Sequence, residues 1–154
     1  MEHLSIEDAF RKWGDDLTRY ATAMVGPADA SDVVSEAFTA VLAAGDHRWE
    51  QVREPRGYLF RSVANAARMW ARSGSRRHRR EMRWPVEGVV GELVTDPAVR
   101  RALDRLSVRQ RAAVFVTYWL DASPTEAASM LGVSEGAVKR HLARGRATLR
   151  EVLG

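Results

Sequence analysis

Cationic side chains at helical spacing near the C-terminus are the residues of this chain best suited to bind another molecule. Lys139, Arg140 and Arg144 fall on one face of a helix, and Ala143 between them leaves room for close approach. Guanidinium and ammonium groups donate hydrogen bonds to the base edges and phosphates of duplex DNA. We therefore predict a DNA-reading face composed of Ser134, Glu135, Lys139, Arg140, Ala143 and Arg144. The alternative is a basic amphipathic helix whose outer face is only solvated.

The residues around this face predict the helix-turn-helix unit that would position it. Ser123 can cap a first helix, Pro124 presets its first turn, and Glu126 completes a capping box. Gly132 accepts the left-handed conformation that ends such a helix, and Ser134 can cap the next one. The second helix then has a buried stripe at three- and four-residue spacing, formed by Val138, Leu142, Gly145, Leu149 and Val152.

A second cationic stripe is predicted in the middle of the chain. A helix over residues 55–73 would bury its apolar side and present Arg61, Asn65, Arg68 and Arg72 on its outer side. The stripe leads into an arginine-rich run at 76–80 that is suited to phosphate contacts. For the run, the alternative is a solvated end of a linker.

Helical periodicity dominates the 154 residues, 45% of which are hydrophobic, and no stretch shows sustained strand-type alternation. The predicted fold class is therefore all-α, with two small helical domains joined by a linker. Besides the helix-turn-helix and the helix at 55–73, capping and stop signals predict helices at about 5–26, 28–44, 97–106 and 107–120. Residues 5–8 resemble a capping box at the first of these, and Ser107 with Gln110 is expected to form one at the last. A polar loop carrying Trp49 is expected at residues 45–55.

The net charge of +4 is distributed unevenly. Residues 1–45 have three basic and eight acidic side chains, a net charge of −5, whereas residues 46–83 have eleven and four, a net charge of +7. Residues 107–154 have seven basic and four acidic side chains, a net charge of +3. Two basic zones indicate two contacts with nucleic acid, and the acidic zone indicates a surface for a different partner.

Several function classes are excluded by composition. The absence of cysteine rules out disulfides, thiolate zinc sites and cysteine nucleophiles. The four histidines are scattered, and no metalloprotease, phosphate-loop or serine-hydrolase motif is present, so we expect neither an enzyme nor a cofactor or metal. No apolar run approaches the length of a membrane span, and we expect a soluble cytoplasmic protein.

Four segments match one set of family patterns. Residues 32–38 (DVVSEAF) are similar to Asp-x-x-Gln-Glu-x-Phe, and residues 55–65 (PRGYLFRSVAN) are similar to Pro-Arg-x-Trp-Leu-x-x-x-Ala-x-Asn. Residues 106–111 and 132–139 match the upstream-element reader of the same family. Together they resemble the extracytoplasmic-function (ECF) sigma factors of the sigma-70 family, the two-domain promoter-recognition subunits of bacterial RNA polymerase.

The resemblance implies a domain organisation and a set of protein partners. Residues 1–78 would form the region 2-like domain, 79–96 a linker that threads toward the RNA exit channel, and 97–154 the region 4-like domain. Core RNA polymerase would be bound through its β′ clamp and β flap. The clamp contacts implied by the resemblance are Asp32, Ser35, Glu36 and Thr39. The sequence leaves open whether an anti-sigma factor also binds.

The resemblance also implies how promoter DNA is divided between the two domains. The −35 element would be read as duplex by the C-terminal reader. The −10 element would be captured as single strand, with a flipped base held by the loop around Trp49 and by Asn65. The expected phosphate contacts are Arg61, Arg68, Arg72, Arg76 and Arg77.

Three positions depart from the family patterns. Ser35 replaces the usual Gln in the polymerase-binding segment, and Tyr58 replaces Trp while keeping an aromatic side chain. Met69 stands where the family frequently has Asp, so the family's specificity for the downstream promoter element cannot be assigned to this chain.

The competing interpretation is an autonomous helix-turn-helix regulator that needs no polymerase core. Such a regulator would show alternating strands and helices in its N-terminal half.

Overall fold

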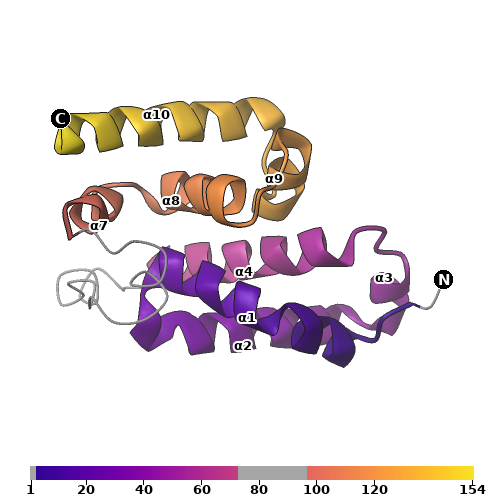
Figure 1. Cartoon of the computed structure of the whole chain (residues 1–154). Helices are drawn as coiled ribbons and strands as arrows, with labels where there is room; N and C mark the ends of the chain where they lie inside the picture. Colours follow the sequence, from indigo (N-terminus) through magenta and orange to yellow (C-terminus); the bar gives the residue numbers. More distant parts are fainter. Residues whose placement is uncertain (1–2, 73–96) are drawn as a thin grey trace.

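All secondary structure in the described part of the chain is helical. The computed structural model describes residues 3–72 and 97–154, and the elements in these two ranges are α-helices and one π-helix (Figure 1). The prediction of an all-α fold is confirmed. No helix within the described ranges is long and apolar enough to cross a membrane.

Three long helices and one short helix make up the N-terminal half. They are α1 (Ile6–Val25), α2 (Pro27–Ala44), α3 (Asp46–Glu50) and α4 (Pro55–Arg72). Ser5 begins α1 as predicted, because its hydroxyl accepts a hydrogen bond from the backbone N–H of Asp8 at 3.1 Å. Gly26 and Gly45, at φ 89° and 90°, adopt left-handed backbone conformations that separate α1 from α2 and α2 from α3.

The segment between α2 and α4 differs from the predicted loop. It contains the short helix α3, and Trp49 on that helix is only 3% exposed. The indole N–H donates a hydrogen bond to the carbonyl oxygen of Leu4 at 2.6 Å, and the ring meets Tyr58 edge-on at 6.0 Å between centroids. The buried side chain of Trp49 therefore attaches α3 to the residues that precede α1.

The C-terminal half contains α7 (Pro97–Asp104), α8 (Val108–Val114), the π-helix η1 (Phe115–Trp119), α9 (Pro124–Leu131) and α10 (Glu135–Leu153). The capping boxes predicted at Ser107 and Ser123 are present: Ser107 exchanges hydrogen bonds of 3.1 and 3.0 Å with Gln110, and Ser123 exchanges bonds of 3.1 and 3.2 Å with Glu126. The helix expected at 107–120 is continuous, but its last turn widens to a π-helix.

The two halves pack on one another, and buried residues of both contribute to one hydrophobic cluster. Figure 1 shows α8 and α9 lying against the bundle formed by α1, α2 and α4, with α10 on the far side of α8. At the contact, the ring of Tyr20 on α1 lies 5.2 Å from that of Phe60 on α4 and 5.6 Å from that of Phe115 on η1. Tyr20 and Phe60 are fully buried, so this aromatic group is the apolar centre of the interface.

Candidate nucleic-acid interface

The predicted reading face of α10 is free in the structure. Ser134, Glu135, Lys139, Arg140, Ala143 and Arg144 are all exposed. The opposite side of the helix is held by Val138 and Leu142, which are buried, and by Gly145. A Cβ on Gly145 would lie 3.4 Å from Val114 on α8, so the glycine lets the two helices approach closely. Leu149 and Val152 continue the stripe but are only half-buried.

Local hydrogen bonds fix the geometry of the helix-turn-helix. Gly132 ends α9 in the left-handed conformation at φ 67°, and the Ser134 hydroxyl accepts from the Ala137 N–H at 3.1 Å. The Thr125 hydroxyl on α9 donates to the Glu135 carboxylate at the start of α10. A backbone hydrogen bond from Ser123 lowers the pKa of the Glu126 carboxyl, which favours the ionised carboxylate in the Ser123–Glu126 capping box. The reading helix is thus held rigidly while its cationic face stays open.

The outer stripe of α4 is placed as predicted but is only partly accessible. Asn65 and Arg72 are exposed, whereas Arg61 and Arg68 are half-buried. The Asn65 side-chain oxygen accepts a hydrogen bond from the Arg68 guanidinium. The predicted phosphate contacts Arg76 and Arg77 lie outside the described residues.

Trp49 requires a correction to the predicted base-capture site. Its indole is buried and bonded to Leu4, so it offers no face to a nucleobase in this structure. Residues of α3, α4 and the segment between them line a cavity of about 370 Å³, and among the described residues neither Trp49 nor Asn65 lines it. The lining residues are Arg48, Gln51, Val52, Arg53, Glu54, Tyr58, Arg61 and Ser129.

The chemistry of this cavity suits a base and its phosphate. The Arg61 guanidinium lies 5.6 Å from the centre of the Tyr58 ring, so an aromatic face and a cation stand together. Arg48 and Arg53 add further charge at the same site. Sequence reasoning missed both arginines, although each lies within four residues of Trp49 in a strongly basic block.

The predicted polymerase-binding residues share the exposed side of α2. Asp32, Ser35, Glu36 and Thr39 are all exposed. Ser35 and Thr39 line a groove of about 470 Å³ between α1 and α2. Its floor includes Phe10 and Phe38, which meet edge-on at 4.7 Å, and its α1 rim includes the acidic Glu7 and Asp15. The α1 residues of the groove were not predicted, because the sequence alone does not show that α1 and α2 lie side by side.

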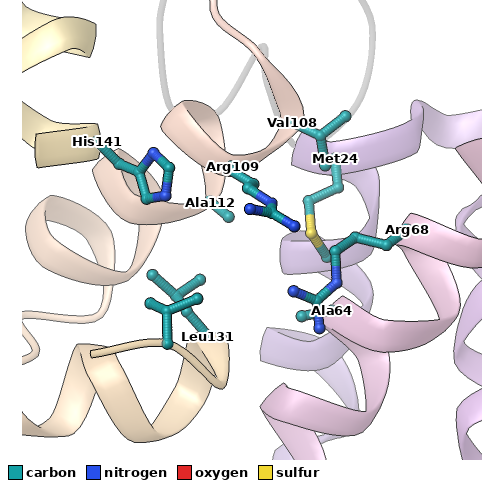
Figure 2. A pocket seen from close by; sticks show the side chains of 9 residues that line it. Met24, Ala64, Arg68, Val108, Arg109, Ala112, Leu131 and His141 are labelled. Carbon is teal, nitrogen blue, oxygen red and sulfur yellow. The ribbon is translucent and has the colours of Figure 1, made fainter. Parts of the chain in front are cut away.

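A third cavity, of about 20 Å³, lies between the two halves (Figure 2). Arg68 on α4 lines it on one side, and Arg109 on α8 and His141 on α10 line it on the other. Among the described residues, no carboxylate lines it. Burial and then Arg109 lower the pKa of the Arg68 guanidinium. Burial, and then the nearby arginines Arg109, Arg140 and Arg144, lower the pKa of His141.

Comparisons with known proteins match both halves of the chain. The family "Sigma-70 region 2" matches residues 9–77, and "Sigma-70, region 4" matches residues 97–149. The RNA polymerase sigma-E factor of Streptomyces coelicolor is 33% identical over 99% of this chain and 88% of its own length. The ECF RNA polymerase sigma factor SigM of Mycobacterium tuberculosis is 36% identical over 82% of this chain, and the match spans 65% of SigM.

A solved structure has the same fold. It is the sigma factor RpoE in complex with the anti-sigma factor NepR from Bartonella quintana, at a TM-score of 0.71 and 20% identity. The match covers 96% of this chain and 95% of RpoE, so it includes helices of both halves.

Proposed function

The chain belongs to the ECF group of the sigma-70 family, and from this membership we propose that it binds core RNA polymerase and starts transcription at promoters with −35 and −10 elements. The observation that carries the proposal is the coexistence, on one chain, of an open cationic reading helix and a separate cationic cavity next to α4. The exposed face of α10 suits duplex DNA, and the cavity next to α4 suits single-stranded DNA. Work on promoter DNA would place the protein in the cytoplasm.

The −35 element is assigned to α10. Its exposed face presents Lys139, Arg140 and Arg144, while Ala143 allows the backbone to come close to the groove. An arginine can donate two hydrogen bonds to a guanine edge in the major groove, which gives this face a means of sequence discrimination. The hydrogen bond from Thr125 to Glu135 links the start of α9 to the start of α10, the two helices of the helix-turn-helix.

The −10 element is assigned to the outer face of α4 and to the cavity beside it. Tyr58 offers the aromatic side chain on which an unstacked base can pack. Arg48, Arg53 and Arg61 line the same cavity and would neutralise the adjoining phosphates. Trp49 would not contact the strand; its hydrogen bond to Leu4 holds α3 in place. Asn65 and Arg68 extend the contact along the helix.

Core polymerase is assigned to the exposed side of α2. Asp32 and Glu36 provide negative charge there, and the groove with Phe10 and Phe38 provides an apolar anchor point next to it. A basic helical segment with an apolar side chain would complement both properties. The acidic N-terminal zone of the sequence thus faces the protein partner, and the basic zones face DNA.

An anti-sigma factor is a further proposed partner, because the similar RpoE structure contains one. A protein of that class would compete with core polymerase for the chain. Adding an anti-sigma factor to a transcription reaction is expected to remove the transcripts that depend on this chain. An unchanged transcript pattern would reject that protein as a partner.

Reconstitution tests the proposed function. The purified chain is mixed with bacterial core RNA polymerase, and the mixture is tested for comigration and for transcription from a library of genomic fragments. We expect transcripts with defined start sites that core alone does not produce. A triple variant with Lys139, Arg140 and Arg144 changed to Ala is the control, because it keeps the α2 face and should bind core without selecting promoters. Duplex DNA binding without any binding to core would favour an autonomous regulator.

A further inference from the structure

An arginine and a tyrosine form an exposed pair beside the reading face of α10. The Arg146 Nε–H donates a hydrogen bond to the Tyr118 hydroxyl oxygen at 2.8 Å, and the Arg146 Nη2 group donates a second one to the same oxygen. The guanidinium carbon lies 5.6 Å from the centre of the Tyr118 ring. Tyr118 is 60% exposed and Arg146 is exposed as well, so the pair faces solvent and not the core.

The π-helix η1 brings Tyr118 to this position. Its wide turn is closed by a hydrogen bond from the Leu120 N–H to the Phe115 carbonyl oxygen at 3.3 Å. An extra residue in a helical turn rotates the side chains that follow it by about 100° relative to a regular α-helix. Phe115 and Val116 stay buried in this turn, while Tyr118 projects outward. Wide turns of this kind are frequent at functional sites.

Arg146 lies at the flank of the reading face. At 3.6 residues per turn, it falls within about 20° of Lys139 around the helix axis and about 10 Å further along that axis. On its other side it adjoins the buried stripe of Val138 and Leu142. When the centre of a helix reads base edges, its flanks approach the sugar-phosphate backbones that form the walls of the groove. Arg146 is therefore placed to contact a phosphate and not a base.

The hydrogen-bonding capacity of the pair is only partly used. Arg146 directs its Nε and Nη2 groups at Tyr118, which leaves the donors of Nη1 for another acceptor. The Tyr118 oxygen accepts both bonds, so its own O–H can donate to a third group. No carboxylate of the described residues pairs with Arg146, and its partner Tyr118 does not neutralise its charge. A cationic donor and a hydroxyl donor thus stand together, and a phosphate group can accept from both.

We propose that Tyr118 and Arg146 form a phosphate clamp that binds one backbone phosphate of the −35 duplex at the edge of the major groove. The inference rests on the proposed role of α10 as the reading helix. Tyr118 holds the guanidinium in place before DNA binds, so less side-chain entropy is lost on binding. The clamp sets the register of α10 on the duplex, while the base contacts of the reading face select the sequence.

Single neutral phosphates locate the contact. A panel of −35 duplexes is prepared, each with one methylphosphonate in place of a phosphate, and binding to the purified chain is measured. We expect the wild type to lose affinity when the phosphate at the clamp is neutralised. In Arg146→Gln, the same methylphosphonate should have no further effect, while the others keep theirs. Arg105→Gln, at an exposed position on α7, is the control and should keep the full wild-type pattern.

The salt dependence of binding gives a second readout. Arg146→Gln should weaken the preferred −35 duplex and a scrambled duplex by the same factor, and it should reduce the slope of log affinity against log salt by about 1. Tyr118→Phe keeps the ring and removes the O–H, and it should weaken both duplexes by a smaller factor. Because both side chains act on one phosphate, the double variant should lose less than the product of the two single losses.

The possible results separate the clamp from other roles of the pair. Identical methylphosphonate patterns in Arg146→Gln and the wild type would overturn the clamp. So would a lower urea midpoint with unchanged DNA affinity, because the pair would then only link η1 to α10. Weaker binding to core polymerase with unchanged duplex affinity would assign the pair to a protein partner and overturn the clamp as well. If the wild type itself does not prefer the −35 duplex to the scrambled one, the proposed function of α10 fails instead.

Discussion

Arg68 of α4 and Arg109 of α8 line the same cavity between the two halves of the chain, and no acidic side chain from residues 3–72 or 97–154 lines it (Figure 2). Arg109 contributes to lowering the pKa of Arg68, after burial. Two like charges thus meet where two packed helical domains touch. Their repulsion should weaken the packing of the domains without affecting either domain alone.

Removing one of these charges should stabilise the folded chain. Arg109→Gln is expected to raise the free energy of unfolding by a few tenths of a kcal/mol, about the size of effects between partly exposed charges. Urea unfolding at low salt measures it. Arg105→Gln is the control, because Arg105 is exposed and does not line the cavity. A destabilising effect of Arg109→Gln would show that Arg109 is favourably paired.

Stability should fall in mild acid because of His141. Burial and the arginines Arg109, Arg140 and Arg144 hold the pKa of His141 below its ordinary value of 6.5, and Arg68 lines the same cavity from α4. The unfolded chain therefore binds the proton more readily, so the free energy of unfolding decreases as the pH falls from about 6.5 toward the lower folded-state pKa. Urea unfolding at several pH values measures this slope. His141→Gln should flatten it, and an unchanged slope in that variant would assign the pH dependence to other groups.

Because α10 is proposed to read bases, replacing Arg144 should weaken the binding of −35 duplex DNA in a sequence-dependent way. Arg144→Ala should cost about 1–3 kcal/mol of binding to the best −35 duplex and relax the preference at one base pair. Competition binding with single-base variants of the duplex measures both effects. Arg150→Ala, at an exposed site near the end of the same helix, should leave the base preference unchanged. A uniform loss for all duplexes would make Arg144 a phosphate contact.

Asn65 should affect the opening of promoter DNA but not the binding of duplex. Its side-chain oxygen accepts from Arg68, so two roles need to be separated: contact with the strand and support of the arginine. Asn65→Ala removes both, whereas Asn65→Asp keeps an acceptor for Arg68 and loses the amide donor. We expect Asn65→Ala to reduce open-complex formation, measured by permanganate reactivity of unpaired thymines. A normal level with Asn65→Ala would reject both roles, and rescue by Asn65→Asp would assign the effect to Arg68.

The acidic side of α2 predicts a change in polymerase affinity. Glu36→Arg should weaken binding to core RNA polymerase about tenfold or more, because it reverses a charge on the proposed contact surface. Fluorescence titration of the labelled chain with core measures the affinity. Glu151→Arg, an exposed reversal on the last turn of α10, is the matched control. Equal affinity of both variants would move the polymerase interface away from α2.

The sequence by itself determined the long helices of this protein and which side of each is apolar, whereas the short helix α3 was expected as a loop. Ser107 with Gln110 and Ser123 with Glu126 form capping boxes as predicted, because such boxes depend only on residues three positions apart. The exposed face of α10 follows equally from periodicity. These features needed no knowledge of distant parts of the chain.

Only the tertiary structure decided which helix faces remain accessible. Trp49 turns inward because it bonds to Leu4, which lies 45 residues away in the sequence. Ser129 reaches the cavity beside Tyr58 because α9 packs on α4, and no local signal in either segment specifies that pairing. Contacts between distant residues depend on how whole apolar faces fit together. Helical periodicity shows that a face is apolar, and packing alone selects its partner.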